Sequence, residues 1–297
     1  MLSGRRSFRD FKMSSLAQTS DPIAVGNTGE HWAEVARLWQ QLGPPLRPSA
    51  ADVSIYDQRC FGVARRIDSL QALILGVTPE LHALRWPSET DLLAIDHTRG
   101  MIEAVWPGPE GSALCAEWTD MPLESASRDV ALCDGGLPLL AYPQTHRQLA
   151  RELQRVLVRD GLFVTRLFVP SARHESVDEV LRDLVSGRVS CLNALKLRLW
   201  DAIQSEVSVG VRLGDVWNAV SDLAPSLDAL ADRLGWEREH LQPLTTYREC
   251  ASRYHLVSVE EVTRVFCDEC RGFDLRAVDI PSYPLGDRCP IVTFQRV

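Results

Sequence analysis

The feature that most constrains the fold of this chain is a short apolar segment at residues 71–77, Gln-Ala-Leu-Ile-Leu-Gly-Val. Consecutive apolar residues of this kind are typical of a strand buried on both faces of a parallel sheet. A second apolar strand at residues 91–96 follows a short helical pattern and ends in a carboxylate, Asp96. Strand, glycine-bearing turn, helix, strand and acid is the order of a nucleotide-binding βαβ unit, in which the acid lies about 20 residues after the turn.

The alternation of strands and helices continues as far as residue 169. Two helices, at residues 31–42 and 49–63, come before the first strand. Further apolar segments predict three more strands, and apolar residues at helical spacing predict the helices between them (strands 113–117, 128–133 and 162–169; helices 81–84, 101–106 and 144–158). Such alternation predicts an α/β fold with a doubly wound, mostly parallel sheet.

The pattern changes after the fifth strand. Residues 172–255 contain only helical patterns, and a last helix and two strands then complete a seven-stranded sheet (258–270, 273–280 and 290–296). We therefore expect a helical cap inserted after strand 5, over the C-terminal strand edges where α/β sheets bind ligands. The expected divisions are a mobile N-terminal tail, N-terminal helices, the core, the cap and the last elements of the core (residues 1–28, 29–69, 70–171, 172–255 and 256–297).

Composition limits the class of partner. The net charge of −8 and the pI near 5.4 argue against a broad nucleic-acid surface. No segment approaches the roughly 18 apolar residues of a membrane span, and the arginines near the N-terminus lack the apolar segment of a secretory signal. The pair Cys267 and Cys270 has no second pair at zinc-site spacing. We expect a cytoplasmic protein without a metal site.

Five segments in the right order resemble the class I S-adenosylmethionine-dependent methyltransferases. They are the strand ending at Gly76, the acid Asp96, residues 116–123, the strand ending in Asp134, and the segment Leu149–Gly161, which ends in Arg-Val-Leu-Val-Arg-Asp-Gly. The resemblance implies the fold of that family and S-adenosylmethionine as cofactor. It implies that Asp96 binds the ribose, Glu117 the adenine amino group and Trp118 the adenine ring, and it adds further cofactor-binding residues (Gly76, His97, Met101, Asp134 and Gly135).

The turn after the first strand departs from the family pattern. Val77-Thr-Pro79 stands where further glycines are usual. Thr78 is a candidate for binding the carboxylate of the cofactor, and Glu80 or Asp134 for binding its ammonium group. The alternative is that Thr78 and Glu80 only begin the following helix.

Methyl transfer depends mainly on aligning the nucleophile, the methyl carbon and the sulfur, although a nucleophile that carries a proton needs a base. Candidate catalytic residues are Asp134, Tyr56 and Tyr142. Asp134 ends a strand beside two glycines, which let a substrate approach the backbone. We expect the side chains of His146 and His174 to face solvent.

The expected activity is methyl transfer to a small-molecule acceptor, in specialised metabolism, in a pocket that the cap closes. Two alternatives stay open. Because the same sulfonium activates the aminocarboxypropyl arm, the enzyme could transfer that arm or cyclise it to azetidine-2-carboxylate, releasing methylthioadenosine. The other alternative is a protein that binds the cofactor without turnover.

Overall fold

The structure is a computed structural model that describes residues 28–64 and 69–297. The predicted tail therefore lies outside the described residues, except for Thr28. Among the described residues, no helix combines the length and the apolar character that crossing a bilayer requires.

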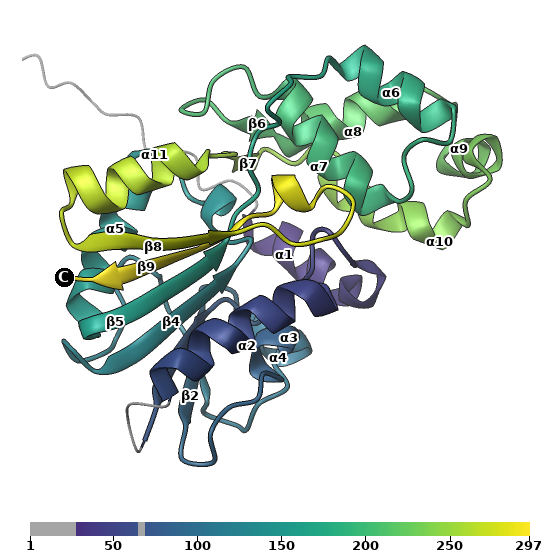
Figure 1. The fold of residues 1–297 in the computed structure, drawn as a ribbon. Helices are drawn as coiled ribbons and strands as arrows, with labels where there is room; N and C mark the ends of the chain where they lie inside the picture. The colour runs from purple at the N-terminus through teal and green to yellow at the C-terminus, as the bar shows by residue number, and fades with distance from the viewer. Residues whose placement is uncertain (1–27, 65–68) are drawn as a thin grey trace, which may run out of the picture.

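A seven-stranded sheet forms the centre of the molecule (Figure 1), in the order β3-β2-β1-β4-β5-β9-β8. Strands β1 to β5 are parallel, and β9 runs antiparallel to both of its neighbours. The predicted α/β fold with a mostly parallel seven-stranded sheet is confirmed. The strands are β1 (Gln71–Leu75), β2 (Asp91–Asp96), β3 (Ala113–Cys115), β4 (Arg128–Asp134), β5 (Leu157–Arg166), β8 (Phe273–Asp279) and β9 (Ile291–Arg296).

The central strands have no polar face, because each face packs against a layer of helices. In β1, Leu73 and Leu75 belong to the core on one face, while Ala72 and Ile74 belong to the core on the other. Ile74 lies between Ala94 of β2 and Leu132 of β4 in the parallel register. This two-sided burial explains why the strands read as continuous apolar segments.

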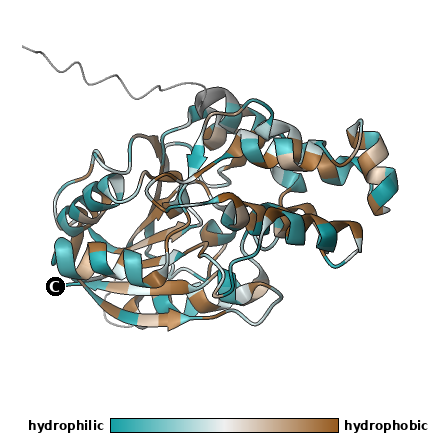
Figure 2. Ribbon diagram, turned by 90° about the horizontal axis from the view of Figure 1, so that it is seen from above, coloured by the Kyte–Doolittle hydropathy of each residue, from teal (hydrophilic) through white to brown (hydrophobic). Residues whose placement is uncertain are grey.

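Helices cover both faces of the sheet (Figure 1). One face packs against α2 (Ala50–Ala64), α3 (Pro79–His82) and α4 (Arg99–Val105). The other packs against α5 (Gln144–Val156) and α11 (Val259–Thr263), which the π-helical turn η4 (Arg264–Glu269) continues. Figure 2 shows that these outer helices carry both hydrophilic and hydrophobic residues. Burying the apolar side of each helix leaves its polar side to water.

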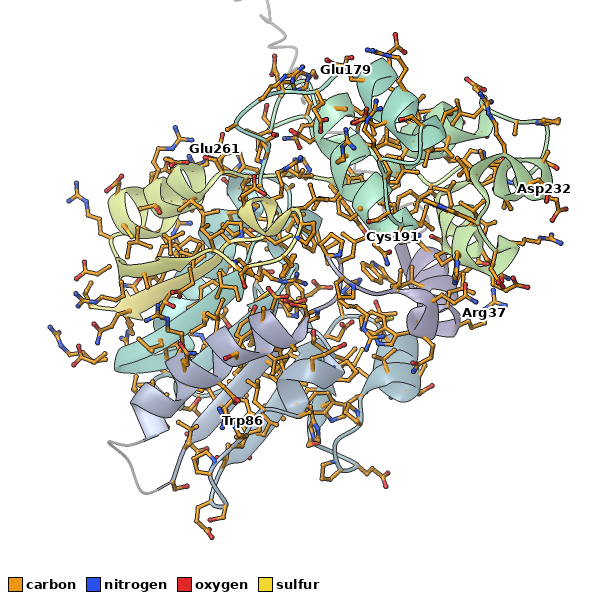
Figure 3. The ribbon with its side chains drawn as sticks, turned by 45° about the vertical axis from the view of Figure 1, so that its right-hand side comes forward. Arg37, Trp86, Glu179, Cys191, Asp232 and Glu261 are labelled. Carbon is orange, nitrogen blue, oxygen red and sulfur yellow. The ribbon has the colours of Figure 1, made fainter. Side chains whose placement is uncertain are left out.

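Five of the helices between β5 and α11, together with the 3-10 helix η3, are called the cap helices here (α6 Val177–Val185, α7 Leu192–Ile203, α8 Leu213–Ser221, α9 Leu227–Leu234, α10 Arg238–Leu241 and η3 Gln242–Tyr247). They share a hydrophobic core of their own, formed largely by α7 and α8. α1 (Thr28–Arg37), continued by η1 (Trp39–Gln41), contacts η3. Figure 3 labels Arg37, the last residue of α1, and Cys191, which precedes α7. Two further 3-10 turns are η2 (Leu137–Leu139) and η5 (Gly286–Arg288).

Two details of the sequence prediction are wrong. The segment predicted as purely helical contains a small antiparallel sheet, in which β6 (Val211–Arg212) pairs with β7 (Arg253–Tyr254). Two-residue strands are too short to show any periodicity. The helix before β5 also ends earlier than predicted, at Val156, and β5 begins at the next residue. A register shift between Arg128 and Val130 of β4 takes up the extra residues of β5.

The expectation that His146 faces solvent is wrong, whereas His174 is exposed. His146 is fully buried on α5, beside the ring of Tyr142. Its ring nitrogens have no hydrogen-bond partner among the described residues. Burial lowers the pKa of His146 to about 4, because a protonated imidazole there would lose its hydration.

We predict that His146 makes the protein less stable in acid. The unfolded chain binds the proton at the ordinary pKa of 6.5, so stability present above pH 6.5 is lost as the pH falls toward 4. At pH 5 the loss is on the order of 2 kcal/mol. Urea unfolding at pH 7.5 and pH 5 measures it, and His146→Leu should reduce the difference while the exposed His174→Leu leaves it unchanged. Equal pH dependence in all three proteins contradicts the prediction.

A buried ion network lies beneath the C-terminal ends of β4 and β5. The Arg166 guanidinium forms two hydrogen bonds with the Asp134 carboxylate, Nε to Oδ1 at 2.7 Å and Nη2 to Oδ2 at 2.9 Å. Arg166 Nη1 also donates to the carbonyl of Pro45 at 2.7 Å and lies 3.7 Å from Asp52 Oδ2. Burial alone would lower the pKa of Arg166, but the two carboxylates raise it well above its ordinary value.

We predict that Arg166→Met destabilises the protein by about 3–5 kcal/mol, because the variant leaves two buried carboxylates without their cation. The matched control is Arg59→Met. Arg59 also binds a carboxylate with two hydrogen-bonding nitrogens, that of Asp279, but both side chains are about a third exposed. Its loss should cost about 1 kcal/mol or less. Similar shifts of the urea midpoint in the two variants would show that the buried network contributes nothing special.

Candidate functional site

A cavity lies at the C-terminal ends of β1, β2 and β4, and holds about 1120 Å³ of space, part of it open to solvent. The core lines it through the residues that follow these strands, and α1 and the cap helices line it from the other side. This is the edge at which open α/β sheets bind ligands. Its lining includes Trp32, Trp39, Gly76, Thr78, Asp96, His97, Met101, Trp118, Asp134, Gly135, Phe168, Lys196, Trp200, Tyr247 and Tyr254.

The turn after β1 brings backbone into the cavity. Gly76 has a φ of +92°, a conformation that favours glycine, and its N–H donates to the carbonyl of Ile95 at 2.7 Å. Thr78 precedes α3 as its N-cap residue, but its side chain makes no capping hydrogen bond. The Thr78 side chain is buried and lines the cavity instead. The single-glycine turn thus leaves a hydroxyl where most members of the resembled family would have another glycine.

The Asp96 carboxylate lies at the end of β2 and lines the cavity. Its Oδ1 accepts a hydrogen bond from the Thr98 N–H at 2.7 Å, which fixes the orientation of the group. Burial raises the pKa of Asp96, and the Thr98 bond and the nearby His97 oppose that rise. A ligand hydroxyl donating to Asp96 would therefore replace hydration that the cavity has partly removed.

Trp118 and Met101 form apolar walls beside Asp96. The indole Nε1 of Trp118 donates to the carbonyl of Ile95 at 2.7 Å, which locks the ring in place. A side chain at Gly136 would collide with this ring and with Cys133, at 2.9 and 2.6 Å from the first added carbon. His97 lines the cavity with an exposed side chain, whereas Glu117 is exposed and is absent from the lining.

Asp134 is the last residue of β4, Gly135 follows it, and both line the cavity. Gly135 has a φ of +59°, and an added side-chain carbon would lie 2.7 Å from the Phe168 ring. Burial raises the pKa of Asp134 and the Arg166 guanidinium opposes the rise. Each Asp134 oxygen accepts one hydrogen bond from that guanidinium, which holds the carboxylate in a fixed orientation.

Besides Glu117, three more predicted residues lie outside the cavity lining. The fully buried Tyr56 hydroxyl donates to the carbonyl of Cys133 at 2.8 Å and accepts from the Arg166 N–H at 2.9 Å, so we assign it a structural role in place of the catalytic one. The Tyr142 hydroxyl is bound by Arg264, and the cavity lining does not include Tyr142. Glu80 binds Arg47 through hydrogen bonds of 2.9 and 2.5 Å, and its partner Arg47 lines the cavity instead.

Sequence reasoning missed the residues that α1 and the cap helices contribute. His31, Lys196, Trp200 and Tyr247 line the cavity although none belongs to a recognised motif. One signal was available in the composition. Lys196 is one of only two lysines in the chain, the other being Lys12, although Lys and Arg together number 32. A lysine in an apolar helix of an arginine-rich protein is an unusual choice and could have been singled out.

The residues present fit S-adenosylmethionine. An oriented carboxylate at the end of β2 suits two ribose hydroxyls, the walls formed by Trp118 and Met101 suit a planar base, and the crowded glycines leave backbone exposed where a ligand can approach closely. No cluster of three or more metal-ligating side chains occurs in the part of the chain that the structure describes.

We predict that Asp96→Ala weakens binding of S-adenosylhomocysteine by about 2 kcal/mol, roughly thirtyfold, because the ribose hydroxyls lose a charged partner. Isothermal titration calorimetry measures the effect. The matched control is Asp91→Ala, at the other end of the same strand, where the carboxylate is 59% exposed and lies away from the cavity. Unchanged affinity in Asp96→Ala would remove this residue from the cofactor site.

Residues 75–165 match a family model described as "Methyltransferase domain", and a comparison with curated proteins finds no match. Among solved structures, a proposed Zn-dependent alcohol dehydrogenase from Rhodobacter sphaeroides is 14% identical with a TM-score of 0.53, over 88% of this chain and 97% of that chain. A chain from the complex of the Haloferax volcanii Trm112 methyltransferase activator with a proposed methyltransferase is 12% identical with a TM-score of 0.47, over 91% and 97%. The N-methyltransferase NodS from Bradyrhizobium japonicum, in complex with S-adenosyl-L-homocysteine, is 10% identical with a TM-score of 0.46, over 88% and 96%.

At these identities the structures compare folds alone, whereas the family model matches the segment that runs from the end of β1 into β5. That segment contains the turn at Gly76, the acid Asp96 and the ring of Trp118, all of which line the cavity. Residues 75–165 therefore form a methyltransferase domain with the fold of the class I S-adenosylmethionine-dependent methyltransferases, so the protein is a methyltransferase enzyme and S-adenosylmethionine is its cofactor.

Proposed function

We propose that this methyltransferase acts on a small organic acceptor held between the sheet and the cap helices. The observation that carries the proposal is the continuity of the cavity. Its lining extends from Asp96 and Trp118 on the core to Trp200 and Tyr254 beyond them, so that one space borders both the candidate cofactor residues and the cap helices. A cleft lined mainly by apolar and aromatic side chains with a few polar groups is typical of sites for small molecules.

The proposed roles of the core residues follow from their chemistry. Asp96 binds the ribose hydroxyls, and the walls formed by Trp118 and Met101 enclose the adenine. Thr78 and the backbone after Gly76 bind the amino-acid end of the cofactor. His97, with its exposed side chain, borders the opening, and the backbone of Gly135 lies near the reacting centre.

When bound, the sulfonium supplies a methyl group that is already activated. The chain then has to position the acceptor atom in line with the methyl carbon and the sulfur, and alignment alone accounts for much of such a rate enhancement. Three buried aromatic residues, Phe168, Trp200 and Tyr254, suit this task. The ring centroid of Trp200 lies 5.9 Å from that of Phe168 and 5.1 Å from that of Tyr254. Rigid aromatic walls orient an apolar acceptor and exclude water.

The character of the lining supports a small acceptor in preference to a nucleic acid. The part of the cavity next to the cap helices is mainly aromatic and aliphatic, and the chain carries a net charge of −8. A phosphate backbone requires several cations along its path. All eight cysteines are free thiols, which is in keeping with a location in the reducing cytoplasm.

We predict that the purified protein, incubated with S-adenosylmethionine and a library of small organic acceptors, releases S-adenosylhomocysteine in proportion to methylated product. The acceptor-free reaction is the control, and liquid chromatography with mass spectrometry separates the products. Formation of methylthioadenosine and a cyclic imino acid without an acceptor would contradict methyl transfer and support the cyclisation alternative. Binding of the cofactor without any turnover across a broad acceptor library would favour a non-catalytic protein.

A further inference from the structure

We propose that the acceptor carries a carboxylate and that Lys196 binds it at the cap side of the cavity. This inference rests on the proposed methyl transfer to a small acceptor and specifies the class of molecule: an apolar, aromatic-sized acid. It assigns to Lys196 the role of a residue that determines specificity.

Lys196 lies on α7 with only 2% of its surface exposed, and it lines the cavity. Its Nζ donates to the carbonyl of Pro243 at 3.0 Å and lies 4.4 Å from the centroid of the Tyr247 ring. These contacts use one N–H and one aromatic face. An ammonium group has three N–H donors, so donors remain for a ligand in the cavity.

The other buried cations of the described chain show what Lys196 lacks. Arg166, Arg198 and Arg288 are also less than a tenth exposed, and each is paired with a carboxylate. Lys196 forms no ion pair with a carboxylate of the described residues, and its pKa is lowered by burial alone. A buried cation is costly unless an anion accompanies it. Since no carboxylate of the described residues pairs with Lys196, we infer that a ligand supplies the anion.

The surroundings of Lys196 add a second polar contact. His31 on α1 donates from Nδ1 to the carbonyl of Thr246 at 3.0 Å, which leaves Nε2 as an acceptor in the neutral ring. Nε2 is buried in the cavity lining and has no partner among the described residues. The same short helix, η3, holds both side chains through its carbonyls at Pro243 and Thr246. The site therefore suits an acid that also carries a hydroxyl or N–H group.

An aromatic path joins this basic end to the cofactor end. Trp200 lies one helical turn after Lys196 on α7 and contacts both Tyr254 and Phe168. The ring of Phe168 in turn lies so close to Gly135, next to Asp134, that it leaves no space for a side chain at that glycine. An apolar body lying along these rings would place its carboxylate at Lys196 and its other end near the reacting centre.

The charge state of Lys196 offers a direct readout. Burial lowers the pKa of Lys196 to about 7, and a bound carboxylate would raise it. The titratable groups that face it are His31 on α1 and Tyr247 on η3. Burial lowers the pKa of His31 to about 4 and raises that of Tyr247 well above its ordinary value. Neither changes its charge between pH 6 and 9, so a titration in that range belongs to Lys196.

The chain contains two lysines, Lys12 and Lys196, so protein labelled with carbon-13 lysine gives two side-chain signals, which Lys12→Arg assigns. With saturating S-adenosylhomocysteine, the Lys196 signal should titrate near pH 7. Adding indole-3-acetate should raise its pKa by about one unit or more, because an adjacent opposite charge favours the ammonium form. Indole-3-acetamide, of nearly the same shape but neutral, should leave the titration unchanged.

Binding measurements supply the second arm. Lys196→Met should weaken binding of indole-3-acetate by about tenfold or more, the effect of one lost charge-assisted contact. Binding of indole-3-acetamide and of S-adenosylhomocysteine should change by less than about twofold. This combination separates loss of the carboxylate contact from a general loss of structure, which would weaken all three.

Three results would contradict the proposal or its basis. A raised Lys196 pKa with S-adenosylhomocysteine alone would assign the lysine to the carboxylate of the cofactor and overturn the inference. An unshifted titration with indole-3-acetate, benzoate, phenylacetate and hydrocinnamate would overturn it as well, while leaving methyl transfer intact. If the wild-type protein binds no S-adenosylhomocysteine, the proposed function itself fails.

Discussion

The buried pairing of Arg166 with Asp134 is the interaction on which the site depends. It joins the ends of β4 and β5, and through Pro45 and Asp52 it also holds the segment before α2 and the start of that helix. A guanidinium in this position requires carboxylates around it, since an unpaired charge would cost several kcal/mol to bury. The network consequently fixes the peptide after Asp134, and with it the backbone that borders the cavity.

Crowding at that backbone explains the two glycines. A side-chain carbon added at Gly135 would collide with the ring of Phe168, and one added at Gly136 would collide with the ring of Trp118. With the rings locked in place, backbone forms this part of the wall, and a ligand can approach it closely. The aromatic residues thus shape the cavity in two ways. They line it directly, and they leave no space for side chains at the two positions after Asp134.

The sheet and its helices could be predicted from the sequence because their signals are local. Strands buried on both faces give continuous apolar segments, as β1 and β4 do, and helices such as α5 give a strong period. The carboxylate of Asp96 and the ring of Trp118 could be predicted because they lie at fixed places after strands. Contacts between distant residues carry no such signal. The burial of His146 and the contacts of Tyr56 with β4 and β5 depend on how distant segments pack, so they could not be predicted from the residues around them in the sequence.

The use of lysine at residue 196, in a chain that otherwise relies on arginine, has a physical reason. An arginine stays charged under all ordinary conditions, so burying one requires a permanent carboxylate partner, as Arg166 and Arg288 have. A lysine can release its proton when the cavity holds no anion, and burial has brought the pKa of Lys196 to about 7. The side chain can therefore remain buried without a built-in counterion and become charged when an anion arrives. A permanent carboxylate beside it would remove this property, because it would occupy the position that a ligand has to fill.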